Sequence, residues 1–279
     1  MSDFSVPGTA TGQRQGWDRI HDFAWNSSAI RKILVLALLA LIWELAARYN
    51  GKPILFPTFT ATMTALWEAI TTENLLQSAW ASLYVLLKGY VIAIALAFVF
   101  VSLAVVSRFV RELLQTLISM FNPLPAIALL PVAMLWFGLG EKSLLVVLVH
   151  AVLWPFALAA LTGFESVPET QRLVGRNYGL RGPSYVVRIL IPAALPSILY
   201  GMKIAWAFAW RTLIAAELVF GVSSSAGGLG WFIFRNRNEL FTDKVFAGLA
   251  MVIIIGLLVE GIIFRIVENV TVRRWGMQR

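Results

Sequence analysis

The chain alternates long apolar runs with polar connectors. A helix that crosses a lipid bilayer needs about 20 mostly apolar residues. Six stretches fit this requirement and are predicted to span a membrane: residues 33–49, 83–106, 113–140, 143–164, 197–220 and 245–267. The pattern therefore predicts an all-α membrane protein with six transmembrane helices in one domain, residues 33–270.

Polar segments flank this domain. Residues 1–32 contain no apolar run, so we expect a cytoplasmic tail, with a short interfacial helix around residues 17–25, rather than a cleavable signal peptide. Residues 271–279 form a second predicted tail. Between the first two spans, residues 50–82 carry apolar side chains at helical spacing, which predicts an amphipathic helix: Met63, Leu66, Trp67 and Ile70.

Composition and charge support the membrane assignment. The chain is 59% apolar and 14% charged, whereas soluble domains average about 45–50% and about 25%. In the orientation with both termini in the cytoplasm, thirteen Lys and Arg lie inside, six lie outside and four lie within spans. Positive charge favours the cytoplasmic side, so this orientation is predicted, and the net charge of +8 gives no reason to expect nucleic acid. The chain lacks cysteine, which excludes disulfides and thiolate sites.

The longest ordered connector, residues 165–196, falls on the cytoplasmic side in this orientation. It holds four arginines: Arg172, Arg176, Arg181 and Arg188. Ser166 and Glu169 have the spacing of a capping box, which predicts a helix start. Gly179 is expected to end that helix, Gly182-Pro183 to begin a second one, and Pro196 to begin the fifth span. Such a helix pair could dock on a soluble partner, or its arginines could anchor it to anionic headgroups.

The third predicted span contains three prolines. Each proline removes a backbone donor and crowds the preceding turn, so Pro123, Pro125 and Pro131 are expected to kink the helix beside the Asn122 amide. Unpaired carbonyls at membrane depth persist where protein or a water-filled cavity satisfies them. The pattern favours a bending helix that lines a pathway, with a kinked packing helix as the alternative.

Charged and polar groups within the spans are few. Arg211 lies deepest and should face the bundle interior or a cavity, because an exposed arginine at the bilayer centre is costly. Glu217 lies six residues on and cannot share its helical face, so we expect Arg211 to pair with another helix or subunit, with a direct anion site as the alternative. His150 is expected to be a neutral, hydrogen-bonded helix residue rather than a metal ligand.

The connector resembles the EAA loop of ABC importer permeases, E-A-A-x3-G-x9-I-x-L-P. Gly179, Ile189 and Pro192 match the pattern, Ile191 replaces Leu, and the first triplet is Leu173-Val174-Gly175. Over roughly residues 33–275 the chain is similar to the nitrate/taurine/sulfonate-type branch. Three stretches carry the similarity: NPLPAIALLPVAMLWFGLGEKS, PAALPSILYGMKIAWAFAWRTLIAAEL and GGLGWFIFRNRNELFTDKVFAGLAMVIIIGLLVE.

The resemblance implies a type I ABC importer permease fold in the bacterial inner membrane, with transport of a small anion or zwitterion such as nitrate, taurine, an alkanesulfonate or bicarbonate. Partners would be a second copy, two cytoplasmic ATPases, a periplasmic or lipid-anchored solute-binding protein and membrane lipid. The coupling to the ATPase would use Leu173, Val174, Gly175, Gly179, Ile189, Ile191 and Pro192. The pathway would use Asn122, Pro123, Pro125, Pro131, Arg211 and Glu217.

Several motifs are missing from the sequence. It holds no G-x-x-x-x-G-K-[ST] phosphate loop, so ATP and Mg²⁺ are expected on a separate ATPase subunit and no cofactor is expected on this chain. Neither G-x-S-x-G nor H-E-x-x-H occurs, which disfavours an intramembrane enzyme. The main alternative is an ATPase-independent secondary transporter or channel, which would need intramembrane acids; Glu44 and Glu260 lie near the ends of spans.

Overall fold

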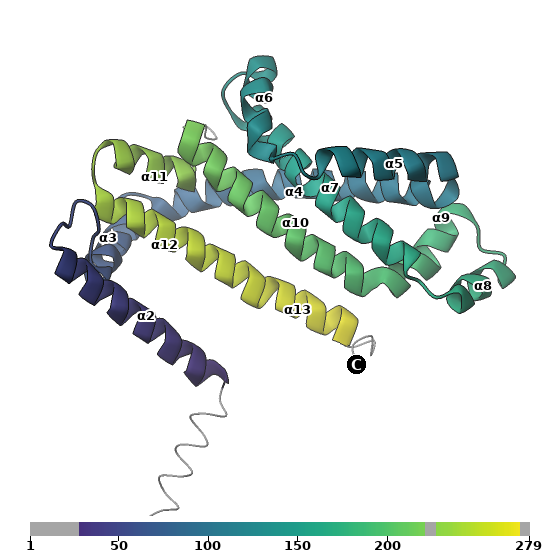
Figure 1. Cartoon of the computed structure of the whole chain (residues 1–279), viewed down its shortest axis with the longest axis horizontal. Coiled ribbons are helices and arrows are strands. Elements are labelled where there is room, and N and C mark those ends of the chain that lie inside the picture. The colour runs from purple at the N-terminus through teal and green to yellow at the C-terminus, as the bar shows by residue number, and fades with distance from the viewer. Residues whose placement is uncertain (1–27, 221–226, 274–279) are drawn as a thin grey trace, which may run out of the picture. The chain divides into compact units, whose positions relative to one another are not determined.

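The computed structural model describes residues 28–220 and 227–273 (Figure 1). Within these ranges the regular structure is helical. The helix predicted around residues 17–25 lies outside the described residues. The chain divides into two compact units, residues 1–63 and 64–279.

The first unit contains α2, Ser28–Asn50, and the beginning of α3, Phe59–Thr72. The Trp43 indole donates to the carbonyl of Pro57 at 3.0 Å, and its ring packs edge-on against Phe59 at 5.5 Å. The Glu44 carboxylate accepts from the backbone N–H of Thr60 at 3.0 Å and also binds Arg48. Glu44 therefore satisfies an unpaired donor in the first turn of α3, which is a structural role.

The second unit contains the helices long and apolar enough to cross a membrane. Among the described residues there are four: α4, Leu75–Val106; α7, Glu141–Glu165; Gly182–Phe220; and Thr242–Thr271. They confirm helices over the second, fourth, fifth and sixth predicted spans. The first predicted span lies within α2, and its passage through the membrane stays a prediction, as do the cytoplasmic termini. The helix predicted between the first two spans is confirmed as α3, although Trp67 is 69% exposed.

The third predicted span is not one bending helix. Residues 113–140 form α5, Arg108–Phe121, then a 3₁₀ turn, Ala126–Leu129, and α6, Leu130–Phe137. The two arms meet at 89°, so the predicted kink is in fact a break between two helices. Pro123 and Pro125 lie in the break, because two prolines so close together remove two helical donors. Pro131 lies in the first turn of α6, where proline is tolerated, and causes no kink.

Helix α7 packs along both α4 and α10, Ile191–Phe220. Small residues allow these helices to approach closely. A Cβ atom added at Gly163 would lie 2.6 Å from Cβ of Ser197, and one at Gly201 would lie 2.5 Å from Cβ of Ala159. Lipid is as apolar as leucine, so close van der Waals packing rather than hydrophobic burial holds such helices together.

The last helices complete the second unit. Helix α11, Leu229–Asn238, packs on α10 and on α12, Thr242–Leu258. The chain continues through a π-helical turn, Val259–Phe264, into α13, Arg265–Glu268, and a further π turn, Asn269–Arg273. Glu268 on α13 binds Lys203 on α10 at 2.6 Å.

Candidate functional site

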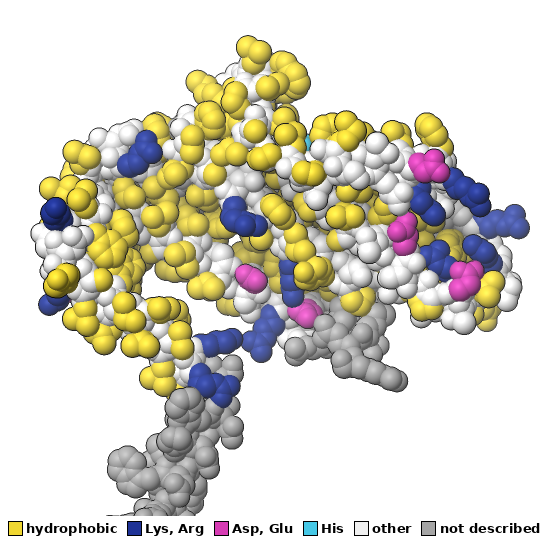
Figure 2. All heavy atoms as spheres, in the orientation of Figure 1, with side chains coloured by type: hydrophobic (Ala, Val, Ile, Leu, Met, Phe, Trp, Pro, Cys, Tyr) yellow, Lys and Arg dark blue, Asp and Glu magenta, His cyan; other side chains and the backbone are white. Residues whose placement is uncertain are grey.

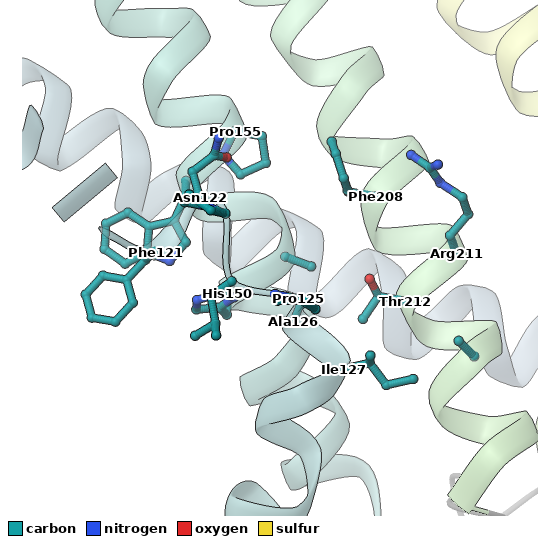
Figure 3. Close-up of a pocket in the computed structure, with 15 residues that line it drawn as sticks. Phe121, Asn122, Pro125, Ala126, Ile127, His150, Pro155, Phe208, Arg211 and Thr212 are labelled. Carbon is teal, nitrogen blue, oxygen red and sulfur yellow. The ribbon is translucent and has the colours of Figure 1, made fainter. Parts of the chain in front are cut away.

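A cavity of about 410 Å³ lies where the broken helix meets α7 and α10 (Figure 3). We call it the Arg211 cavity. The stretch from Phe121 to Ile127 forms one wall, so the break caused by the prolines shapes it directly. Of the residues predicted to form the pathway in this region, Asn122, Pro123 and Pro125 line the cavity, whereas Pro131 is not among its lining residues.

The polar groups around this cavity are mostly hydrogen-bond donors. Asn122 comes from the end of α5, His150 and Trp154 from α7, and Arg211 and Thr212 from α10. No aspartate or glutamate occurs among the described residues that line it. A wall of donors without a carboxylate suits an anionic or strongly polar solute better than a cation.

His150 lies in an aromatic cluster. Phe121 stacks on Trp154 with ring centroids 5.0 Å apart and meets His150 edge-on at 6.0 Å. Within the described part of the chain, neither nitrogen of His150 nor the indole N–H of Trp154 has a hydrogen-bond partner. The prediction of a hydrogen-bonded His150 is therefore wrong for these residues, because apolar rings surround its nitrogens.

Arg211 points along α10 toward Phe208 and away from His150 (Figure 3). Its Nε donates to the carbonyl of Ala207 at 3.0 Å, and its guanidinium lies 5.0 Å from the centroid of the Phe208 ring. It makes no ion pair with any other described residue. The charge of Arg211 is thus available to the cavity or to a second chain.

A second cavity of about 610 Å³, the Tyr200 cavity, adjoins the first. Both are lined by Asn122, Pro155 and Phe208, and the second extends along α7 and α10 as far as Pro196. The run from Ala215 to Pro196 along α10 corresponds to roughly 30 Å of helix, close to the thickness of a bilayer core. The lining residues of the two adjoining cavities together cover about this length, and we call the pair the passage.

Glu217 lies outside this passage. Its carboxylate is fully buried and accepts from the Ser82 hydroxyl at 2.8 and 3.0 Å and from the Gly230 N–H at 2.8 Å. The Leu229 N–H donates to the Ser82 oxygen at 2.7 Å. We call this group the Glu217 clamp; it joins α4, α10 and the first turn of α11.

The connector after α7 forms the predicted pair of short helices: α8, Glu169–Asn177, and α9, Gly182–Tyr185. Leu173 and Val174 are half exposed and Tyr178 is 82% exposed. Gly175 is buried, and a Cβ atom there would lie 2.9 Å from Ile189 and 3.0 Å from the Tyr185 ring. The third position of the motif therefore has to be small, whereas the first two face outward.

The end of α8 is a Schellman motif. Gly179 has φ of 72°, its N–H donates to Arg176 at 2.9 Å, and the Leu180 N–H donates to Gly175 at 3.1 Å. At the other end, Arg172 binds the carbonyls of Phe164 and Val167 at 2.5 and 3.0 Å. Arg172 thus fixes α8 to the end of α7.

These features have a counterpart in known proteins. Residues 89–272 match the family of binding-protein-dependent transport system inner membrane components. The chain belongs to this family. It is accordingly a permease protein of the ABC transporter type and a multi-pass protein of the inner membrane.

Curated permeases support the assignment over most of the chain. The taurine transport system permease protein of Escherichia coli is 30% identical and covers 80% of this chain and 82% of its own length. A protein of Methanocaldococcus jannaschii assigned as an ABC transporter permease is 30% identical over 83% of this chain and 87% of its own. The nitrate import permease protein of Synechocystis is 26% identical over 85% and 88%.

Two local predictions about the permease connector were wrong. Ser166 does not cap α8; its hydroxyl donates to the carbonyl of Gly163 at 2.9 Å, because Ser166 ends α7 and Pro168 precedes α8. Pro196 does not begin the fifth span. It lies inside α10, which follows α9 through a π-helical turn, Val186–Leu190, that contains Ile189. Ile191 and Pro192 form the first turn of α10, where proline is tolerated.

The sequence analysis of the permease missed the polar partners of its site. Ser82 and Gly230 bind Glu217 from positions 135 residues before it and 13 after it, so no local spacing reveals the clamp. Trp154 and Thr212 were overlooked as lining residues because each reads as part of an apolar span. Trp154 lies one helical turn after His150, which was the available signal for that residue.

Proposed function

We propose that this permease moves a small anion or zwitterion across the inner membrane by alternating access, as a subunit of an ATP-driven importer. The observation that carries the proposal is the passage of roughly 30 Å formed by the Arg211 and Tyr200 cavities. Donor groups line its first part, and Asn122 and Phe208 stand where the two cavities join. Relatives named for taurine and nitrate transport fit a solute of this class.

We propose that a second copy of the chain completes the passage and that the complete six-span subunit has both termini in the cytoplasm. The uncompensated Arg211 would then face either the solute or the second copy.

Energy would come from a separate ATPase that binds ATP and Mg²⁺. Leu173, Val174 and Tyr178 offer an exposed apolar surface on α8, and Gly175 and Arg172 hold that helix against the bundle. A solute-binding protein would deliver the cargo on the opposite side and would largely set its identity.

Reconstitution tests this proposal. The permease is assembled in vesicles with a partner ATPase and a solute-binding protein, and uptake of labelled taurine, nitrate and alkanesulfonates is measured with and without ATP. Leu173→Asp should lower ATP-dependent uptake at least about tenfold, because it replaces an apolar side chain at the proposed docking contact with a charged one. The matched control, Leu240→Asp, changes a 73% exposed leucine at the far end of the unit and should transport normally.

The outcomes separate the candidate functions. Uptake by the permease alone, without ATPase, would support the secondary transporter or channel instead. Normal ATP-dependent uptake by Leu173→Asp would rule out α8 as the docking helix.

A further inference from the structure

The turn between α8 and α9 borders a pocket that the transport proposal does not use. This pocket has a volume of about 380 Å³ and is lined by Val105, Val106, Arg176, Leu180, Arg181, Gly182 and Tyr185. Figure 2 shows Lys and Arg side chains gathered at the end of the second unit that carries α8 and α9 in Figure 1. We call it the Arg176–Arg181 pocket.

The pocket carries more positive than negative charge. Arg176 has only a distant contact to Glu169, at 3.9 Å, and both side chains are about two-thirds exposed. Arg181 makes no ion pair with any described residue, and no acidic residue is among those that line the pocket. The Tyr185 hydroxyl is buried and lacks a hydrogen-bond partner among the described residues. Two guanidinium groups and a free hydroxyl are suited to phosphate oxygens.

An apolar groove is lined by neighbouring residues of the same two segments. It has a volume of about 400 Å³ and is lined by Phe98, Val99, Ser102, Leu103, Pro183, Val186, Val187 and Ile191. The groove and the pocket share no lining residue, but Ser102 and Leu103 precede Val105 and Val106 on α4, and Val186 follows Tyr185. We call it the Phe98 groove.

We propose that the Arg176–Arg181 pocket and the Phe98 groove together bind one anionic phospholipid. The phosphate lies between the two arginines and the Tyr185 hydroxyl, and an acyl chain follows α4 along the groove. A soluble phosphate compound would use the pocket alone, whereas the adjoining groove on a membrane-length helix fits a chain of methylene groups. Basic residues at the membrane surface attract anionic lipids, and Arg108 and Arg111 on α5 add charge just beyond Val106.

The site has a consequence for coupling. Arg176 lies on α8, Arg181 on the turn, and the groove wall on the helix that becomes α10. A bound lipid would therefore fix the distance between the docking helix and the start of α10.

Native mass spectrometry of the purified full chain in detergent tests the inference. Phosphatidylglycerol and phosphatidylcholine with identical acyl chains are titrated, and inorganic phosphate is added as a competitor. The chain should retain one phosphatidylglycerol in preference to phosphatidylcholine. Arg176→Gln with Arg181→Gln should reduce that preference roughly 30-fold, because each arginine near a membrane surface contributes a severalfold preference for anionic lipid.

Two controls make the result specific. Arg188→Gln with Arg237→Gln removes the same charge from exposed positions outside the pocket and should leave the preference unchanged. Val99→Trp fills the groove and should weaken the binding of both lipids. Equal retention of the two lipids by the native chain, or an unchanged preference in the Arg176/Arg181 variant, would overturn the inference. Complete displacement of phosphatidylglycerol by inorganic phosphate would identify a soluble phosphate site instead.

Discussion

Helices α8 and α11 lie at opposite ends of the second unit and end in the same hydrogen-bonded turn (Figure 1). In α8 the turn is closed by Gly179, whereas in α11 Leu240 occupies the equivalent position with φ of 63°. The bonds correspond: Leu240 N–H donates to Arg237 at 3.2 Å and Phe241 N–H donates to Asn236 at 3.0 Å. Identical caps therefore end two helices that are held in very different ways.

The difference lies in what each helix buries. Helix α8 buries Gly175 alone among its residues, whereas α11 buries half of its length: Leu229, Gly230, Phe232, Ile233 and Asn236. The Glu217 clamp fixes the start of α11, and Arg235 and Lys244 both bind Glu73 below it. Helix α11 is part of the bundle, while α8 is attached at its base and leaves its remaining surface exposed.

Removal of the clamp should produce the largest effect. In Glu217→Ala, the Ser82 hydroxyl and the Gly230 N–H lose a buried acceptor, which should destabilise the protein by about 2–5 kcal/mol. Thermal unfolding in detergent measures the loss. The exposed Glu260→Ala is the control and should unfold like the native chain. An unchanged melting temperature for Glu217→Ala would show that α11 does not depend on the clamp.

Loss of Arg172 should free α8 without unfolding the bundle. Arg172→Gln removes the charged hydrogen bonds from Arg172 to the end of α7. A hydrogen bond to a charged group contributes about 1.5–3 kcal/mol to stability. Hydrogen exchange should accelerate in residues 169–177 and remain unchanged in α11. Arg188→Gln, on an exposed arginine of the same connector, serves as the control. Equal acceleration in α11 would contradict the separation of the two helices.

Gly175 tests how tightly α8 is seated. Gly175→Val should weaken the contact with Ile189 and Tyr185 by about 1–3 kcal/mol, because extra atoms have no room. Gly175→Ala should be nearly neutral, since helix propensity gains about 1 kcal/mol and offsets the crowding. Hydrogen exchange of α8 compares the two variants. Equal protection in both would show that the contact is loose.

The two caps provide the smallest and most symmetrical test. Leu240→Gly should stabilise the protein by roughly 1 kcal/mol, because glycine adopts a positive φ without strain, and Gly179→Leu should destabilise α8 by a similar amount. Thermal unfolding measures the first and hydrogen exchange the second. A loss of stability in Leu240→Gly would mean that contacts of the leucine side chain outweigh its backbone strain.

Periodicity predicted the elements of this protein where the cause was local. The apolar runs located α4, α7 and α12, and Gly179 was identified because the left-handed residue that ends a helix is most often glycine. The break at Pro123 and Pro125 was predicted only as a kink, since the angle between two arms depends on what each arm packs against.

Contacts between distant segments were beyond such reasoning. The family resemblance placed Glu217 in the pathway, yet its carboxylate is buried and accepts from the Ser82 hydroxyl and the Gly230 N–H. Arg172 and Arg176 share a helical face but differ in role, since one reaches the end of α7 and the other borders a pocket. The motif spacing located the triplet Leu173-Val174-Gly175, while only packing explained why its third residue is glycine.

The helical path from Gly182 to Phe220 has a mechanical consequence. It bends at the π-helical turn, Val186–Leu190, so α9 and α10 do not form one straight rod (Figure 1). The 30 residues of α10 alone correspond to roughly 45 Å, and a tilt of about 5° at one end would displace the other by roughly 4 Å. Because the Glu217 clamp joins the far end of α10 to α11, such a tilt would move α11 as well.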